Sequence, residues 1–215
     1  MAKTCVIGDL HGRFDLFEKA VAALPWDCET VVFLGDYVDR GPQSAQLVAA
    51  LRKGSPSVDQ RWVILRGNHE DMMVESILDE LIGTDSMWMI HGGLQTLASF
   101  KETGDSLKDA ARWMQGLPDT YADQHRVYVH AALHAALPLE WQPRTFTGWT
   151  RYPDNFVGWW NGKHIVHGHT PKTGGPTLMP GRTNMDVGCC RTGLLCIAVF
   201  DDDLPGGPVT LQWVS

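Results

Sequence analysis

Short apolar runs alternate with longer amphipathic stretches over the first third of the chain. The apolar runs predict strands that are covered on both faces, and they lie at Thr4–Ile7, Thr30–Leu34 and Trp62–Leu65. After each run, apolar residues recur at helical spacing, over residues 14–24, 45–51 and 70–81. This order of strand and helix, repeated three times, predicts an α/β fold built in layers.

The rest of the chain follows a different pattern. Residues 84–120 have mostly helical periodicity and predict a small helical insertion beside the main fold rather than a second domain. Residues 126–129 predict a strand, and residues 137–162, rich in Pro and Trp, predict a long loop over the active face. Three further strands are expected to close the fold as a β-meander, at 183–187, 194–200 and 209–214. We therefore expect residues 1–215 to form a single domain.

Each of the first three predicted strands ends at a glycine that is followed by polar side chains. Asp9 and His11 follow the first strand, Asp36 follows the second, and Asn68 and His69 follow the third. Glycine lets the backbone turn sharply, and ligands of open α/β sheets bind outside the carboxyl ends of the strands. The sequence therefore predicts one shared site at this edge of the fold.

Composition narrows the classes of function. The net charge of −7 argues against a permanent surface for nucleic acid or anionic membranes, so an anionic substrate needs metal ions or a few placed arginines. The five cysteines are odd in number and include no C-x-x-C pair, which indicates neither a disulfide framework nor a thiolate zinc site. With no apolar leader segment or spanning run, a reduced, cytoplasmic setting is expected.

Oxygen and imidazole donors make up the candidate metal-ligand set, which comprises Asp9, His11, Asp36, Asn68, His130 and His169. The set contains no thiolate and suits manganese, iron or zinc held for catalysis. Two ions bridged by Asp36 would share a water, lower its pKa and stabilise an in-line displacement at phosphorus. Taken singly, each residue is more often an ordinary turn or surface residue. As one ordered set beside glycines, the six residues are better explained by a metal site.

Five motifs resemble, in order and spacing, the phosphoprotein phosphatase (PPP) family, in particular its small bacterial and phage-type members. They are G-D-L-H-G at 8–12, G-D-Y-V-D-R-G at 35–41, R-G-N-H-E at 66–70, V-H-A at 129–131 and H-G-H-T-P at 167–171. The likeness extends to W-T-R at 149–151 and M-D-V-G at 185–188 and covers essentially the whole chain. It implies the α/β, calcineurin-like metallophosphoesterase fold, a layered β-sandwich flanked by helices, with a small helical insertion.

The resemblance also implies a role for each motif residue. One divalent ion would be held by Asp9, His11 and Asp36, and a second by Asp36, Asn68, His130 and His169, with manganese expected first and iron or zinc as alternatives. His69 would be the general acid, oriented by Asp39. Arg40 and Arg151 would grip the phosphoryl oxygens as guanidinium forks, with Asn68 also in contact with the substrate.

Two features of the sequence allow more than one interpretation. The segment His91-Gly92-Gly93 imitates a ligand motif of the family, but it lies in the predicted helical insertion. We interpret His91 as structural, with substrate contact as the alternative. Trp149 precedes Arg151 by two residues and is assigned to substrate binding, where its ring could stack on an aromatic group; the alternative is that it pins the long loop to the core.

Three functions are compared. The leading hypothesis is a metal-dependent phosphatase of phosphoserine and phosphothreonine, with phosphotyrosine as a further substrate, acting by direct attack of water. The alternative is a symmetrical dinucleoside tetraphosphate hydrolase, which Glu70 and the complete G-D-Y-V-D-R-G motif disfavour. A non-catalytic metal-binding scaffold is the third, and it ranks low because no ligand, acid or arginine is missing. The expected partner is a phosphoprotein or a small phosphoester, with no nucleic acid and no membrane, and the sequence favours no oligomeric state.

Overall fold

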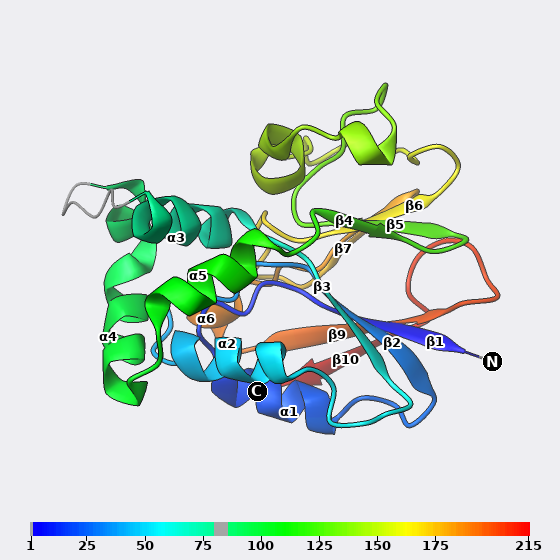
Figure 1. Ribbon diagram of the computed structural model, residues 1–215. Coiled ribbons are helices and arrows are strands. Elements are labelled where there is room, and N and C mark those ends of the chain that lie inside the picture. The colour runs from blue at the N-terminus through cyan, green and yellow to red at the C-terminus, as the bar shows by residue number, and fades with distance from the viewer. Residues whose placement is uncertain (1, 80–85) are drawn as a thin grey trace.

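Two five-stranded sheets pack face to face, and helices lie on their outer side (Figure 1). The structure is a computed structural model that describes residues 2–79 and 86–215. The strand order is β10-β9-β1-β2-β3 in the first sheet and β4-β5-β6-β8-β7 in the second. The predicted α/β fold, a β-sandwich flanked by helices, is confirmed.

Each sheet contains three neighbouring parallel strands. In the first sheet these are β1 (Lys3–Ile7), β2 (Cys28–Phe33) and β3 (Arg61–Ile64), and the antiparallel strands are β9 (Leu195–Asp201) and β10 (Thr210–Val214). In the second sheet the parallel strands are β5 (Arg126–Val129), β6 (His164–His167) and β8 (Arg182–Asn184), and the antiparallel strands are β4 (Thr120–Ala122) and β7 (Thr177–Met179). The parallel strands matter for function because their carboxyl ends lead to the site described below.

Helices cover the first sheet and the carboxyl ends of the parallel strands. They are α1 (Phe14–Ala22), α2 (Ser44–Lys53), α3 (Asn68–Leu78), α4 (Leu94–Thr103), α5 (Leu107–Gln115) and the short α6 (Cys189–Thr192). The predicted insertion is helical over its described part, where a π-turn, Met89–Gly93, precedes α4 and α5. The predicted continuation of α3 to residue 81 and the first residues of the insertion lie outside the described residues. In the part of the chain that the structure describes, no helix has the length and apolar character needed to cross a membrane.

Strand alternation explains the unbroken apolar runs of the sequence. In β1, Cys5 and Ile7 belong to the core that α1 and α2 cover, whereas Val6 belongs to the core between the two sheets. In β2, Val31 and Phe33 face the helices and Val32 faces the second sheet. Both faces of the strands are buried, as the sequence predicts, so no polar position interrupts the run.

The predicted closing β-meander is wrong. The first of its three segments forms β8, which runs parallel to β6 in the second sheet, whereas β9 and β10 pair in the first sheet. The chain crosses between the sheets at α6, which is flanked by Gly188 and Gly193 at φ 64° and 70°. These left-handed glycines turn the chain out of one sheet and into the other, which a hydrophobic pattern alone does not reveal.

A buried histidine at the start of β6 makes stability depend on pH. Burial, followed by the nearby Arg126 guanidinium, lowers the pKa of His164 to about 4 from an ordinary value of 6.5. The unfolded chain therefore takes up the proton first, and stability is lost as the pH falls from 6.5 towards 4. Between pH 7 and pH 5 we expect this residue to reduce the free energy of unfolding by about 1–2 kcal/mol.

The test compares wild type with His164→Gln, whose amide can replace the hydrogen bond from the ring to the Thr183 hydroxyl (2.8 Å) without titrating. Urea unfolding at the two pH values should show a smaller pH-dependent loss in the variant. His125→Gln, in the turn before β5, is the control and should behave like wild type. An equal loss in His164→Gln would show that other groups cause the pH dependence.

Candidate active site

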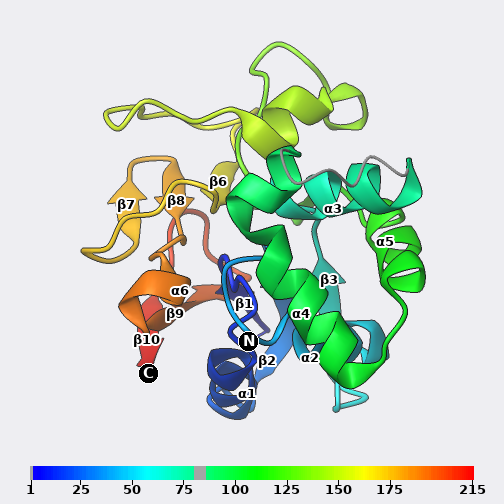
Figure 2. The same ribbon diagram turned by 90° about the vertical axis from the view of Figure 1, so that its left-hand side faces the viewer.

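The carboxyl ends of all six parallel strands deliver polar residues to one place. In the first sheet, Asp9 follows β1, Asp36 follows β2 and Asn68 follows β3. In the second sheet, His130 follows β5 and His169 follows β6. Figure 2 looks towards this edge of the fold, with α6 on one side of β1 and with α3 and α4 on the other. The structure thus brings together the residues that the strand-end pattern predicted.

The sixth strand, β8, delivers Asp186, a residue to which the sequence assigned no role. Its buried carboxyl group lies beside that of Asp9, and burial raises the pKa of Asp186 to about 6. The backbone N–H of Gly188 donates to this carboxylate at 2.9 Å. The M-D-V-G motif therefore contributes a second carboxyl group next to a predicted metal ligand.

The backbone at the site is tightly constrained. Of the six described non-glycine residues with positive φ, five are predicted site residues, namely His11, Asp36, Asp39, Arg40 and His169. Such conformations are unfavourable for residues with a Cβ and concentrate at functional sites. The neighbouring glycines are needed for space, because a Cβ on Gly67 would collide with the Asp36 carboxylate and one on Gly168 with that of Asp9.

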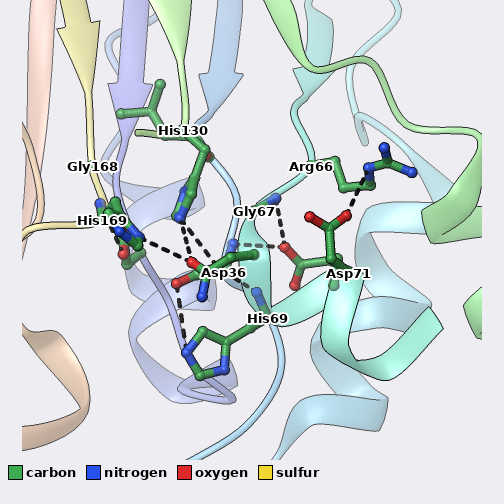
Figure 3. Close-up of polar contacts among 12 residues, drawn as sticks. Asp36, Arg66, Gly67, His69, Asp71, His130, Gly168 and His169 are labelled. Carbon is green, nitrogen blue, oxygen red and sulfur yellow. Dashed lines mark hydrogen bonds and ion pairs between the residues drawn. The ribbon is translucent and has the colours of Figure 1, made fainter. Parts of the chain in front are cut away.

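Asp36 lies at the centre of the cluster, as Figure 3 shows. Its Oδ1 is 3.3 Å from Nε2 of His130, and its Oδ2 is 3.6 Å from Nε2 of His11. Asn68 Oδ1 lies 3.1 Å from Nε2 of His130 and 2.9 Å from Nδ1 of His169. Both Asp9 carboxylate oxygens accept from the backbone N–H of His169 at 3.2 Å. Five of these side chains are almost fully buried, and His169 is half-buried.

The orientation of the imidazoles indicates which nitrogen carries the proton. Nδ1 of His11 donates to the Val38 carbonyl (2.9 Å), Nδ1 of His130 to the Leu34 carbonyl (2.9 Å) and Nε2 of His169 to the Trp149 carbonyl (3.1 Å). The opposite nitrogen of each ring therefore presents a lone pair to the cluster. In His130 and His169 that lone pair faces the Asn68 oxygen, another acceptor.

A cation satisfies such an arrangement, since lone pairs that face each other share no proton. Burial lowers the pKa values of His11, His130 and His169, the last to about 3, which keeps the rings in the neutral form that binds metal. Carbonyl oxygens hold the far nitrogens, as is usual for histidines that ligate a metal. The donor set thus fits divalent ions.

A hydrogen-bonded pair of side chains, His69 and Asp39, lies beside this cluster. Nδ1 of His69 donates to Oδ2 of Asp39 at 2.6 Å, and both side chains are buried. Burial disfavours the charged ring, but the Asp36 and Asp39 carboxylates outweigh it and raise the pKa of His69. His69 therefore favours the imidazolium form more than an ordinary histidine does, and its Nε2 lies 3.9 Å from Oδ2 of Asp36.

The helical insertion holds the other oxygen of Asp39, a contact that the sequence did not predict. Nε1 of Trp88 donates to Asp39 Oδ1 at 2.8 Å, and the Thr96 hydroxyl donates to it at 2.7 Å. Trp88 and Thr96 are completely buried. The carbonyl of Gly92 also accepts from the backbone N–H of Arg40 at 3.4 Å. The insertion is thus joined directly to the His69–Asp39 pair.

These groups open into a cavity of about 460 Å³. Besides the cluster, it is lined by Arg40, Arg151, Trp149, His91 and Arg191. Trp149 is 41% exposed, so its ring is available to a ligand. His91 is exposed and its ring centre lies 6.3 Å from that of His69, which places it in the cavity wall rather than among the cluster's donors.

Two further residues hold the strand ends in register. The buried Glu70 carboxylate accepts from the backbone N–H groups of Asp36 (2.8 Å), Tyr37 (2.8 Å) and Gly67 (2.9 Å). Arg144 donates to the Gly67 carbonyl (2.7 Å) and pairs with Asp71 (2.7 Å). Glu70 could have been found as the third residue of a helix whose cap is Gly67. No sequence signal marks Arg144.

Two mixed sheets that gather histidine and carboxylate donors at their strand ends define a metallophosphoesterase. A family model described as calcineurin-like phosphoesterase matches residues 2–197. The chain therefore belongs to the calcineurin-like phosphoesterase family.

Known proteins agree with this assignment. Serine/threonine-protein phosphatase 1 of Salmonella typhimurium is 27% identical over 177 residues, which is 77% of each chain. A crystal structure provisionally described as a diadenosine tetraphosphatase has a TM-score of 0.64 at 20% identity and covers 99% of this chain and 93% of that one. A serine/threonine phosphatase of Saccharomyces cerevisiae has a TM-score of 0.63 at 17% identity, over 100% and 80% of the two chains. At these identities the two structures support the fold alone.

Proposed function

We propose that the protein is a metal-dependent phosphoprotein phosphatase that hydrolyses phosphoserine and phosphothreonine monoesters. One observation carries the proposal: a buried set of inward-facing donors lies next to the hydrogen-bonded His69–Asp39 pair, in a single cavity. A donor set for cations beside a carboxylate-paired imidazolium is what hydrolysis of a phosphoester with a poor leaving group requires. The likeness to serine/threonine-protein phosphatase 1 supports the substrate class.

For the two ions we propose the ligand sets that the sequence motifs predicted, which the short distances between the donors around Asp36 support. Asp9, His11 and Asp36 would hold one ion, and Asp36, Asn68, His130 and His169 would hold a second, with manganese as the first expectation and iron or zinc as alternatives. Bound ions of this kind lower the pKa of water and offset the negative charge of the phosphoryl group. His69 would give its Nε2 proton to the ester oxygen as the P–O bond breaks.

Arg40 must move for this chemistry. Its Nη1 donates to Nε2 of His11 (2.6 Å), and its Nη2 lies 2.9 Å from Nε2 of His69, a distance that leaves no room for a proton on that nitrogen. A ring nitrogen makes one such contact at a time. Nε2 of His11 therefore cannot bind a metal ion, and Nε2 of His69 cannot donate to the leaving oxygen, while Arg40 occupies these positions. We propose that the guanidinium swings from the two rings to the phosphoryl oxygens, where Arg151 joins it from the opposite loop.

A second candidate is hydrolysis of dinucleoside polyphosphates. It is favoured by the exposed Trp149 ring in the cavity, which can stack on a base, and by the likeness to the provisionally described diadenosine tetraphosphatase. Manganese-loaded protein should be assayed with a phosphoserine peptide and with diadenosine tetraphosphate. A higher kcat/KM for the peptide supports the phosphatase. A preference for the dinucleotide would replace it by the second candidate, and turnover of neither by metal-loaded protein would contradict both.

Thr96→Val tests the contact between the insertion and the general acid. The variant keeps the shape of the side chain but removes one of the two donors to Asp39 Oδ1. It also removes an acceptor of the Asp39 backbone N–H (2.9 Å), which keeps the Ser44 hydroxyl as a partner at 3.2 Å. We expect kcat/KM for phenyl phosphate to fall about 3- to 10-fold, the value of one buried hydrogen bond. For 2,4-dinitrophenyl phosphate, whose leaving group needs no proton, the change should be below about 2-fold.

Ser99→Ala is the matched control for Thr96→Val. Ser99 is equally buried on α4 and forms hydrogen bonds to α2, but it does not touch Asp39. It should alter stability without changing the ratio of the two rates. Equal losses on both substrates in Thr96→Val would show that Thr96 supports only the fold.

A further inference from the structure

Three arginines from separate parts of the chain line the cavity of the site. Arg40 follows β2, Arg151 lies in the long loop, and Arg191 lies on α6. The protein as a whole has a net charge of −7, so this concentration of guanidinium groups is local and can attract an anion. The proposed function uses Arg40 and Arg151, and it leaves Arg191 without a role.

The side chain of Arg191 is free to bind. It is exposed at the cavity, and within the described ranges it makes no hydrogen bond and no ion pair. By contrast, Arg13, which also lies next to α6, is held by Asp15 (2.7 Å) and by the Cys189 carbonyl (3.1 Å). An unpaired guanidinium in the wall of a catalytic cavity can bind an oxyanion group of the substrate.

The backbone that carries Arg191 is fixed relative to the strand ends. The buried Cys189 thiol donates to the Asp9 carbonyl at 3.0 Å, and the backbone N–H of Arg191 donates to the Gly188 carbonyl at 2.9 Å. In Figure 2, α6 and α4 lie on opposite sides of the strand ends. Arg191 is thus carried by an element that lies across the strand ends from α4 of the insertion.

We infer that Arg191 forms a subsite for a second anionic group of the substrate, a phosphoryl or carboxylate group near the phosphoryl group that is cleaved. This inference rests on the proposed function and narrows its substrate class. A cavity of about 460 Å³ has room for more than one phosphoryl group. The second oxyanion comes either from a polyphosphate chain or from an acidic or second phosphorylated residue of a peptide.

The kinetic test compares wild type with Arg191→Met, which keeps the length of the side chain and removes its charge. The substrates are p-nitrophenyl phosphate, a phosphoserine peptide with and without an adjacent aspartate, and diadenosine tetraphosphate. We expect Arg191→Met to lower kcat/KM about 10-fold for substrates with the second anion and less than about 2-fold for the others, because a charge-assisted hydrogen bond is lost only with the former. The substrate that shows the loss identifies the source of the second anion.

Equal losses on all substrates would place Arg191 on the cleaved phosphoryl group, and no loss would exclude the subsite. Both results overturn the inference. Arg52→Met, which removes an exposed arginine from the far end of α2, is the control for a general loss of positive charge and should match wild type on every substrate.

Binding separates this inference from the proposed function. Calorimetry should show that methylenebisphosphonate binds wild type more tightly than inorganic phosphate does, and that Arg191→Met removes at least about 80% of this preference while Arg52→Met keeps it. Because neither probe is hydrolysed, the measurement holds even if the protein turns over none of the substrates and the proposed function fails. An unchanged preference in Arg191→Met would refute the subsite while leaving the proposed function intact.

Discussion

Asp36→Asn should lower kcat/KM for a phosphoserine peptide by at least about 10³-fold, the several kcal/mol that metal ions contribute to such a transition state. Among the residues that the structure describes, Asp36 alone has its two oxygens facing the imidazoles of both halves of the cluster, His130 on one side and His11 on the other. An amide oxygen is a weaker ligand and carries no charge to offset two cations. The loss should therefore appear in metal binding as well as in rate.

Metal binding gives a readout that does not depend on turnover. Manganese should raise the melting temperature of wild type, because a ligand that binds only the folded state stabilises it, and the same concentration should raise that of Asp36→Asn far less. Without metal, the variant should be less stable than wild type at neutral pH. Burial disfavours the Asp36 carboxylate, but the surrounding imidazoles outweigh burial and lower the pKa of Asp36, and a neutral amide loses this interaction.

Asp201→Asn, which changes a strand-end aspartate remote from the cavity, is the control and should keep both activity and the manganese effect. If Asp36→Asn bound manganese and turned over substrate as wild type does, the central place given to Asp36 would be untenable.

The strand ends were predictable because two local signals coincide there. A β-branched apolar run that stops at glycine identifies a buried strand and its turn, and a polar side chain in that turn is placed at the sheet edge. This signal is present before Asp36 and Asn68, and it located them without any tertiary information. The sequence did not predict that β8 pairs with β6 and β7 rather than with the strands that follow it. A local pattern shows that a segment is a strand, but it does not show which strands become its neighbours.

The contacts of the insertion could not be predicted in the same way. Helical periodicity around residue 90 indicates a helix but not which side chain reaches across to another element. Trp88 and Thr96 meet Asp39 only because the Gly92 backbone packs against Arg40, where a Cβ would collide. The positive φ of Arg40 was also beyond local prediction, since arginine does not favour that conformation.

His69→Asn should still bind metal but have a lower kcat, and kcat should fall most for the substrates with the poorest leaving groups. For phosphoserine or an alkyl phosphate we expect a fall of about 10³-fold in kcat, within the usual range for a general acid. For 2,4-dinitrophenyl phosphate the fall should stay below about 10-fold. Manganese content should match wild type, because His69 donates to Asp39 and is not among the rings whose lone pairs face Asn68.

The pH profile of the same variant supplies a second readout. In wild type, burial disfavours the His69 imidazolium, but Asp36 and Asp39 outweigh burial and raise the pKa of His69 above its ordinary value. The acid form therefore persists to higher pH than for an exposed histidine, and the rate on an alkyl phosphate should fall only as the pH rises through this raised pKa. His69→Asn should lack that alkaline limb.

His91→Asn is the matched control for His69→Asn, because it removes a second imidazole from the same cavity wall, 6.3 Å from the first, without touching Asp39. It should keep the alkaline limb, and any effect on rate should be the same for good and poor leaving groups. If His69→Asn hydrolysed an alkyl phosphate as fast as wild type, the proton would have to come from elsewhere. The Asp39 contacts with Trp88 and Thr96 would then serve the fold alone.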